Sequence, residues 1–189
     1  SSFIFKNDPK QAVRYLNNFA KLMRLTLESS MEHVHPVETE VSVLKNYLEL
    51  EKLRFQGKFE YEIEVDDEID YDVGIPPMLI QPHVENAILH GIKPKEEKSF
   101  LSIRFKLDDE LLLCEVEDNG IGRKAATHIQ KNQSVPHDSF STQAIEKQLE
   151  LLSTQYNTPF GFSTVDLENQ GKVIGTRITL GIPYISDYE

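Results

Sequence analysis

The chain has 189 residues, and 20 Lys and Arg against 31 Asp and Glu give a net charge of −11, which argues against a nucleic-acid partner because phosphate neutralisation needs a basic surface. A hydrophobic content of 39% and a charged content of 27% are typical of a soluble globular protein, and no apolar run approaches the ~20 residues of a membrane-spanning helix. The single cysteine, Cys114, excludes an internal disulfide framework and a cysteine-based zinc site, and we expect an acidic, cytosolic protein of mixed α/β class.

An amphipathic helix is predicted from about residue 9 to residue 30, after an Asp-Pro pair that is typical of a helix start. Its apolar residues recur at spacings of three and four, as in a coiled-coil seam. The members of the seam are Val13, Leu16, Ala20, Met23 and Leu27. Two interpretations are open: the seam packs on its own domain, or it pairs with a second helix or subunit. We expect a tendency to dimerise.

Residues 30–37 are predicted to form a linker, with His33 and His35 in a solvated loop rather than a metal site, because no third ligand follows at helical spacing. A second helix is predicted over 38–55, and alternation of apolar and acidic residues predicts a strand over 59–65. The other expected elements are an acidic loop over 66–72, a helix over 77–91, a hairpin over 101–118, a long mobile loop with a short helix over 120–140, a helix over 142–155, and strands over 160–168 and 172–182. Helices on one face of a mostly antiparallel sheet form a two-layer α/β sandwich.

The predicted third helix carries a polar strip of Glu85, Asn86 and His90 beside an apolar side. An ordinary solvated face would explain such a strip. However, Asn is a poor helix former, and surface positions without a function usually carry Lys, Glu or Ala. The strip is therefore a candidate functional site.

A second candidate site is the segment Asp118-Asn119-Gly120-Ile121-Gly122, which follows a predicted strand. An Asn-Gly pair is typical of a type I′ hairpin, but the next residues favour a helix or loop over a second strand. Strand parity puts Asp118 on the same face as Cys114 and Val116, where a carboxylate must find a hydrogen-bond donor. The glycines after it let the backbone approach a flat ligand closely.

In the last predicted strand, Thr176 shares its parity with apolar residues and so places a hydroxyl on the buried face. A core threonine bonded to the backbone would explain it equally. The sequence contains none of the motifs of phosphate-binding loops, dinucleotide-binding folds, zinc proteases or serine hydrolases.

The order of these pieces resembles the GHKL ATPase fold, which gyrase, Hsp90 and the sensor histidine kinases share. Residues 46–55 (NYLELEKLRF), 75–82 (IPPMLIQP) and 84–87 (VENA) are similar to the LytS-type bacterial sensor histidine kinases, and the resemblance covers nearly the whole chain. It implies a two-layer α/β sandwich of the Bergerat type preceded by a helical dimerisation segment. The helical region would cover 1–35 and the ATP-binding catalytic domain 36–189.

The resemblance also implies a role for each candidate residue. Asn86 would ligate the Mg²⁺ that bridges the ATP phosphates, and Glu85 would be the catalytic acid/base beside the phosphoryl acceptor. Asp118 would accept a hydrogen bond from the adenine amino group, with Thr176 supporting it. Residues 123–138 would form the ATP lid. The other implied nucleotide-binding residues are His90, Gly120, Gly122, Ser141 and Thr142.

Three positions depart from the family pattern: Leu89 replaces a Lys, Ser141 stands where a Gly is expected, and Gln148 stands where an Arg is common. Each of them bears on phosphate contact or lid closure. A degenerate ATP-binding or scaffold module that dimerises without turnover is therefore the alternative to an active kinase.

The family places its phospho-accepting His upstream of the first helix, in a segment that residues 1–8 would follow. We therefore expect transfer of the ATP γ-phosphoryl group to a His outside this chain, and from there to an Asp of a LytTR-type response regulator. We expect no autophosphorylation by these residues alone. The resemblance further implies a homodimer and a membrane-anchored bacterial parent protein, with this region on the cytoplasmic side of the inner membrane.

Overall fold

The sheet consists of five strands whose residues alternate between a buried and a more exposed face. The computed structural model describes residues 9–30, 34–108, 111–132, 147, 149–155 and 160–183. Its main strands are β2 (Phe59–Val65), β4 (Ser99–Asp108), β5 (Leu111–Asp118), β6 (Gly161–Asn169) and β7 (Lys172–Pro183). They are ordered β2-β4-β5-β7-β6, with β2 and β4 parallel and the other neighbours antiparallel. The mostly antiparallel sheet confirms the prediction from alternation.

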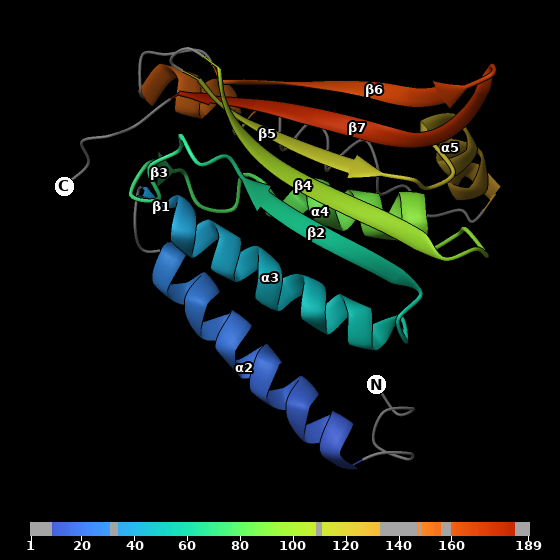
Figure 1. Ribbon diagram of the computed structural model, residues 1–189, viewed down its shortest axis with the longest axis horizontal. Helices are drawn as coiled ribbons and strands as arrows, with labels where there is room; N and C mark the ends of the chain where they lie inside the picture. Colours follow the sequence, from blue (N-terminus) through green and yellow to red (C-terminus); the bar gives the residue numbers. More distant parts are fainter. Residues whose placement is uncertain are drawn as a thin grey trace.

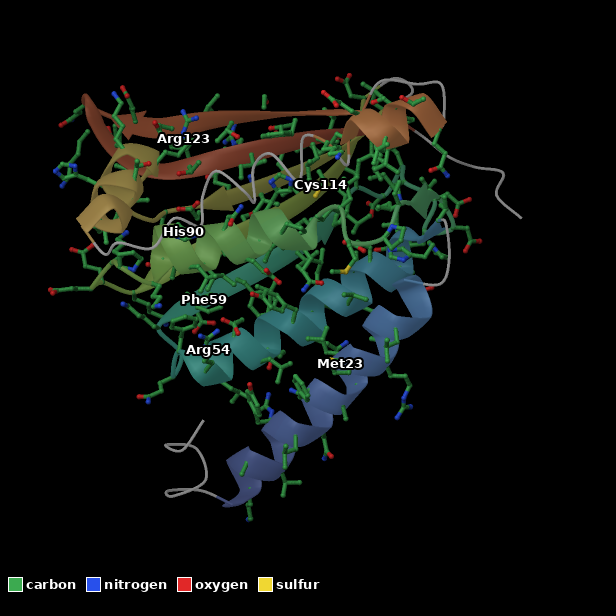
Figure 2. All side chains as sticks on the ribbon, turned by 180° about the vertical axis from the view of Figure 1, so that it is seen from behind. Met23, Arg54, Phe59, His90, Cys114 and Arg123 are labelled. Atoms are coloured by element: carbon green, nitrogen blue, oxygen red, sulfur yellow. The ribbon has the colours of Figure 1, made fainter. Side chains whose placement is uncertain are left out.

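The helices form the second layer, on one face of the sheet (Figure 1). The helical elements are α2 (Pro9–Ser30), α3 (Val37–Arg54), α4 (Gln81–Asn86), the π-helix η1 (Ala87–Ile92) and α5 (Arg123–Asn132). α3 and α4 lie against the sheet, and α2 packs on α3 on the side away from the strands (Figure 2). α5 lies at the end of the sheet where β5 finishes, and the helical residues 149–155 lie at the opposite end. The fold is therefore the expected two-layer α/β sandwich.

The core between the two layers consists of aliphatic and phenylalanine side chains. Its largest fully buried members are Leu44, Leu48, Phe59, Ile75, Leu79, Ile80, Ile88, Ile92, Leu101, Ile103, Phe105 and Leu112. In β5, Leu112, Cys114, Val116 and Asp118 are buried while the residues between them are partly exposed, which confirms the strand parity inferred from the sequence. Burial raises the pKa of the Cys114 thiol, so this side chain is a neutral part of the core.

The helix α2 turns its apolar stripe away from the rest of the described structure. Val13, Leu16, Met23 and Leu27 are 58%, 51%, 44% and 61% exposed, whereas Ala12 is buried. The described part of its own domain therefore leaves most of the stripe exposed. None of the helices in the described ranges is long and apolar enough to span a membrane.

The segment between the first two helices is not the solvated loop that we predicted. It forms the short strand β1 (His35–Pro36), which pairs antiparallel with β3 (Gly74–Ile75). His35 is buried, and its Nε2 lies 2.8 Å from Oε2 of Glu40, which is buried in the first turn of α3. The prediction was wrong because the apolar residues on either side of the segment are themselves buried and carry it into the core.

The third helix begins four residues later than predicted. Met78 has a φ of 61°, which interrupts the helical path after the two prolines, and α4 starts at Gln81. At the other end, the N–H of Lys93 donates to the carbonyl of Ile88, five residues earlier, at 2.8 Å. The helix therefore ends as the π-helix η1, which a pattern of 3.6 residues per turn does not predict.

The region predicted as a long loop with a short helix contains α5 at residues 123–132. Residues 133–140 lie outside the described part of the chain. The same holds for four positions that the sequence analysis singled out, namely His33, Ser141, Thr142 and Gln148.

The variant Glu40→Ala tests the buried pair with His35. Removing the carboxylate leaves the buried imidazole without its partner, and breaking a buried pair on one side costs about 3–5 kcal/mol. We expect the free energy of unfolding, measured by urea denaturation, to fall by about that amount. Glu38→Ala is the matched control, because Glu38 is exposed in the same turn of α3 and its loss should cost less than about 0.5 kcal/mol. Equal losses in the two variants would contradict the role assigned to the pair.

Candidate functional site

Three polar residues lie in one row across the end of the sheet. Asp118, at the end of β5, is the cross-strand partner of Thr176 in β7, and Thr176 is in turn the partner of Asp166 in β6. Directly opposed residues of antiparallel strands face the same side of a sheet. The structure therefore brings Asp118 and Thr176 together on the side that carries the helices, and adds Asp166, which the sequence analysis missed.

The carboxylate of Asp118 is enclosed, with only 4% of the residue exposed. Its Oδ1 accepts a hydrogen bond of 2.7 Å from the backbone N–H of Gly120, so it closes the turn after β5. Burial raises the pKa of Asp118 to about 6, although the bond from Gly120 and the charge of Lys95 act against this shift. Lys95 itself donates to the carbonyl of Asn119 at 2.6 Å. Asp118 is thus a buried acid whose bond to Gly120 engages one of its two oxygens.

Glycines allow other backbone segments to approach Asp118 closely. A Cβ on Gly91 would lie 2.6 Å from Oδ1 of Asp118, and a Cβ on Gly175 would overlap the carbonyl oxygen of Asp118. A Cβ on Gly120 would overlap the backbone of Gly91, so η1 and the turn after β5 touch backbone to backbone. The N–H of Ile121 donates to the carbonyl of Gly91 at 3.1 Å across this contact. Gly91 was missed as a site residue, although a glycine within an apolar helix face is a signal for close approach.

The polar strip predicted on the third helix lies on α4 and η1, where Glu85, Asn86 and His90 are half-buried. The Nε2 of Gln81, one turn earlier, donates to Oε1 of Glu85 at 2.9 Å. Asn86 is the last residue of α4, directly before the π-helix, and His90 lies within that π-helix. A π-helix in this position changes the direction of the side chains that follow Asn86, and such features are frequent at functional sites.

The helix presents Glu85 and Gly91 to different neighbours. Burial, followed by the charges of Glu51 and Glu85, raises the pKa of Tyr47 in α3, so Glu85 lies on the side of α4 that faces α3. Gly91 faces the carboxylate of Asp118 instead. The strip and the buried acid therefore belong to two neighbouring parts of one end of the molecule, and the structure does not place Glu85 against Asp118.

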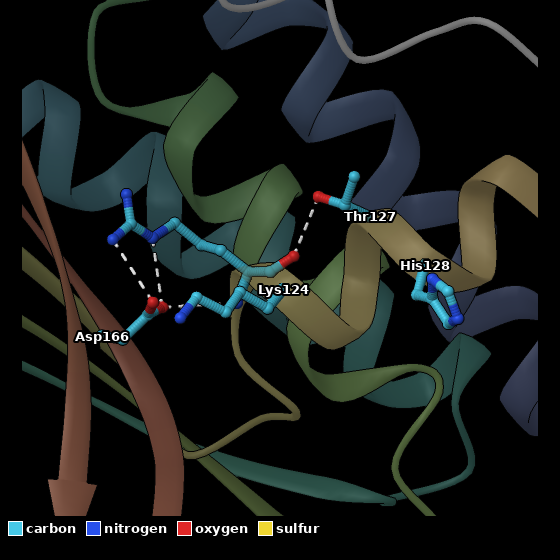
Figure 3. A pocket seen from close by; sticks show the side chains of 5 residues that line it. Lys124, Thr127, His128 and Asp166 are labelled. Atoms are coloured by element: carbon cyan, nitrogen blue, oxygen red, sulfur yellow. Dashed lines mark hydrogen bonds and ion pairs between the residues drawn. The ribbon is translucent and has the colours of Figure 1, made fainter.

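The start of α5 is fixed to β6 by Asp166. Its Oδ1 accepts from the backbone N–H of Arg123 at 3.3 Å and from Nε of Arg123 at 3.1 Å, and its Oδ2 accepts from Nη2 at 3.3 Å. This guanidinium holds the pKa of Asp166 below its usual range. Together with Lys124, Thr127 and His128, the pair lines an open hollow of about 550 Å³ (Figure 3). The beginning of the segment that the resemblance assigns to a lid is thus attached to the row that holds Asp118.

Within the described ranges, no group of three or more His, Cys, Asp and Glu side chains is arranged to hold a metal ion. The polar side chains of the candidate site are nevertheless compatible with Mg²⁺. This ion is commonly bound through one or two protein oxygens, several waters and the phosphates of a substrate. The side-chain amide of Asn86, at the end of α4, carries an oxygen of the kind that Mg²⁺ accepts as a ligand.

Replacing Gly120 by Ala tests the backbone contact with Gly91. The added Cβ would overlap backbone atoms that cannot rotate away, so we expect a loss of roughly 1–3 kcal/mol in the free energy of unfolding. Gly161→Ala is the control, because a Cβ there meets nothing within 4 Å. Chemical denaturation of both variants measures the difference, and a Gly120→Ala variant as stable as Gly161→Ala would refute the contact.

The raised pKa of Asp118 predicts a pH-dependent stability. The pKa is about 6 in the folded protein against an ordinary value of 3.8, so the folded state binds the proton more tightly. The stability that this proton contributes is present below about pH 4 and is lost as the pH rises through about 6. At about 1.4 kcal/mol per unit, the cost of the ionised carboxylate at neutral pH is at most about 3 kcal/mol.

Asp118→Asn is neutral at every pH and keeps an oxygen for the Gly120 bond. We therefore expect its unfolding midpoint to rise relative to the wild type as the pH increases from 4 to 7. Thermal unfolding at intervals over that range is the measurement, and a difference that does not change with pH would count against a raised pKa.

The chain is similar in sequence to known histidine kinases. The family model described as Histidine kinase matches residues 1–59. The sensor protein LytS of Oceanobacillus iheyensis is 33% identical over 119 residues, which cover 63% of this chain and 20% of the relative. The sensor histidine kinase/phosphatase LytS of Staphylococcus aureus is 29% identical over 185 residues, which cover 97% of this chain and 31% of the relative. The chain spans between a fifth and a half of the length of the curated relatives that it matches.

Solved structures share the fold. The mycobacterial sensor histidine kinase MprB superposes with a TM-score of 0.51 at 17% identity, covering 77% of this chain and 95% of that chain. At this identity the likeness concerns the fold alone, which is that of the GHKL catalytic domains of histidine kinases. Taken together, these comparisons show that the chain is similar to the LytS-type sensor histidine kinases in sequence and to histidine kinases in fold.

Proposed function

We propose that residues 36–189 are an ATP-binding catalytic domain. It transfers the γ-phosphoryl group of ATP to a histidine of the sensor kinase, and an aspartate of a response regulator then receives it. The observation that carries this proposal is the buried carboxylate of Asp118, held by the N–H of Gly120 and surrounded by glycine backbone. A flat base with an amino donor suits such a place, because it satisfies the carboxylate and lies against backbone that carries no side chain.

At the adenine end, Asp118 accepts the hydrogen bond of the adenine amino group with the oxygen that does not bind Gly120. Thr176, directly opposite on β7, supports this carboxylate from the same face of the sheet. Gly122, whose φ is 77°, lets the chain turn from β5 into α5 beside the base. Backbone thus sets the shape of the proposed adenine site, and Asp118 supplies its negative charge.

At the phosphate end, the amide oxygen of Asn86 would hold Mg²⁺, which would supply neutralisation of the phosphate charge. The family resemblance assigns the phosphates to His90, Ser141 and Thr142, of which His90 lies in the described part of the chain. Glu85 accepts the proton from one nitrogen of the acceptor imidazole, while the other imidazole nitrogen forms a bond to the γ-phosphorus. The bond from that phosphorus to the β,γ-bridging oxygen breaks, and ADP leaves. Positioning and charge neutralisation supply most of the catalysis in such a transfer.

The same proposal assigns residues 1–35 to a dimerisation segment of a membrane-anchored parent protein, with this region in the cytoplasm and a LytTR-type response regulator as the partner. The stripe on α2 supports the pairing role, because four large apolar side chains are between 44% and 61% exposed there. A homodimer would cover this stripe.

A degenerate module that binds ATP and dimerises without turnover is the second candidate. It is favoured by Leu89, a half-buried aliphatic side chain on η1 that supplies no charge to the phosphates. Ser141 and Gln148 also depart from the family pattern. An assay of labelled γ-phosphate transfer from ATP to a kinase that includes the acceptor histidine separates the two candidates. The degenerate module binds ATP and remains unlabelled.

The variant Asp118→Asn tests the adenine contact. The N–H of Gly120 holds Oδ1 in the wild type, so the amide of the variant keeps its oxygen there and turns its NH₂ group toward the adenine amino donor. The lost hydrogen bond costs about 1–3 kcal/mol, or roughly tenfold to a hundredfold in Kd for Mg-ATP. Calorimetric titration at pH 7.5 measures the change.

Glu117→Gln is the matched control for this titration. Glu117 lies one residue earlier on the opposite face of β5, where its carboxylate binds Arg177 at 2.6 Å. Its replacement should leave ATP affinity within about twofold. Wild-type ATP affinity in a folded Asp118→Asn protein would refute the proposed nucleotide site.

A further inference from the structure

We infer that Gln81 is a positioning residue for Glu85, orienting its carboxylate so that one oxygen remains available to the acceptor imidazole. The inference rests on the proposed function, because it assumes that Glu85 is the acid/base of phosphoryl transfer. Gln81 belongs to the sequence IPPMLIQP, which marks the resemblance to LytS-type kinases but has no role in the nucleotide site described above.

The first observation is the hydrogen bond itself. Gln81 and Glu85 are four residues apart in α4, so their side chains lie on the same face of the helix. The Nε2 of Gln81 donates to Oε1 of Glu85 at 2.9 Å. Because this bond occupies Oε1, the second oxygen, Oε2, is left to face a substrate. A carboxylate that is already held at one oxygen also loses less conformational entropy when it takes the fixed position in which it accepts a proton.

The second observation is that the amide of Gln81 cannot turn over without a cost. Its Oε1 is buried and has no hydrogen-bond partner among the described residues. The opposite orientation would bury the NH₂ group there and aim the carbonyl oxygen at the carboxylate of Glu85. The carboxylate therefore selects the orientation in which the amide donates. Gln81 is the first residue of α4, after the turn at Met78, so its backbone position is set by the helix start.

The third observation concerns the charges between α3 and α4. Arg54 donates to both oxygens of Glu51 at 3.2 Å, so this cation is engaged by Glu51. Burial raises the pKa of Tyr47 in α3, and the charges of Glu51 and Glu85 raise it further while that of Arg54 lowers it, so Tyr47 remains a neutral phenol. Within the described ranges the hydrogen-bond partner of Glu85 is the neutral amide of Gln81. A neutral amide orients a carboxylate without neutralising its charge.

The experiment uses the full-length kinase and compares Gln81→Ala with Gln81→Glu. Gln81→Ala removes the donor, and Gln81→Glu keeps the shape while placing a second negative charge beside Glu85. We expect autophosphorylation at saturating Mg-ATP to fall at least tenfold in Gln81→Ala and further in Gln81→Glu, with Kd for Mg-ATP within twofold of wild type.

Gln56→Ala is the control, since Gln56 is exposed in the turn after α3 and should keep the wild-type rate. Each Gln81 change is also made in Glu85→Gln, where it should have no further effect, because the residue acts through Glu85. Wild-type rates in both Gln81 variants overturn the inference, as do equal losses in the Glu85→Gln background. Loss of ATP binding or of cooperative unfolding in both variants also overturns it, since Gln81 then serves the fold.

The same set of variants separates this inference from the proposed function. A Glu85→Gln kinase with the wild-type rate refutes the acid/base role of Glu85, and the inference fails with it. An inactive Glu85→Gln kinase combined with a normal Gln81→Ala kinase refutes the inference alone.

Discussion

The contact between the backbones of Gly91 and Gly120 is the constraint on which the site depends. Because these glycines touch, η1 lies directly beneath the turn after β5, and no side chain stands between the helix and the carboxylate of Asp118. This enclosure removes water from the carboxylate and is the main cause of its raised pKa. A side chain at either glycine would separate the two segments and admit water. Gly91 and Gly120, which carry no side chains, thus contribute to the raised pKa of Asp118, although Gly91 is far from Asp118 in the sequence.

Regular patterns made most of the fold predictable, and the exceptions have physical reasons. Alternation identified the strands and the buried face of β5, and spacings of three and four identified α2 and α3. His35 was placed in a solvated loop because no third metal ligand follows at helical spacing, whereas its partner Glu40 and the strand β3 create a buried polar site around it. The π-helix was missed for a different reason, since its five-residue hydrogen bonds follow from packing against β5 and have no period of their own in the sequence.

Some residues of the candidate site were likewise predictable from the sequence, and others were not. Asp118 and Thr176 were identified because parity fixes which face a strand residue takes, and the structure confirms that both are buried on the helix side. Asp166 was missed because it meets Arg123 only through the register of β6 on β7, which no local pattern reveals. The bond from Gln81 to Glu85 could have been read from their spacing of four, since it needs only a helix. Its value as a clue depends on knowing that the other amide atom is buried and unpaired.

The two acids of the proposed site illustrate how environment assigns different tasks to the same functional group. Asp118 is taken out of water, and in the absence of a ligand it bears the cost of desolvation, which the single bond from Gly120 offsets only in part. A ligand that donates a hydrogen bond to it removes part of that cost, so stability lost in the free protein returns as affinity. Glu85 is half-buried and accepts a hydrogen bond from the neutral amide of Gln81, which suits the proposed role of an acid that exchanges a proton. A binding acid and a proton-transfer acid therefore need opposite surroundings, and the sandwich supplies them on two sides of one short helix.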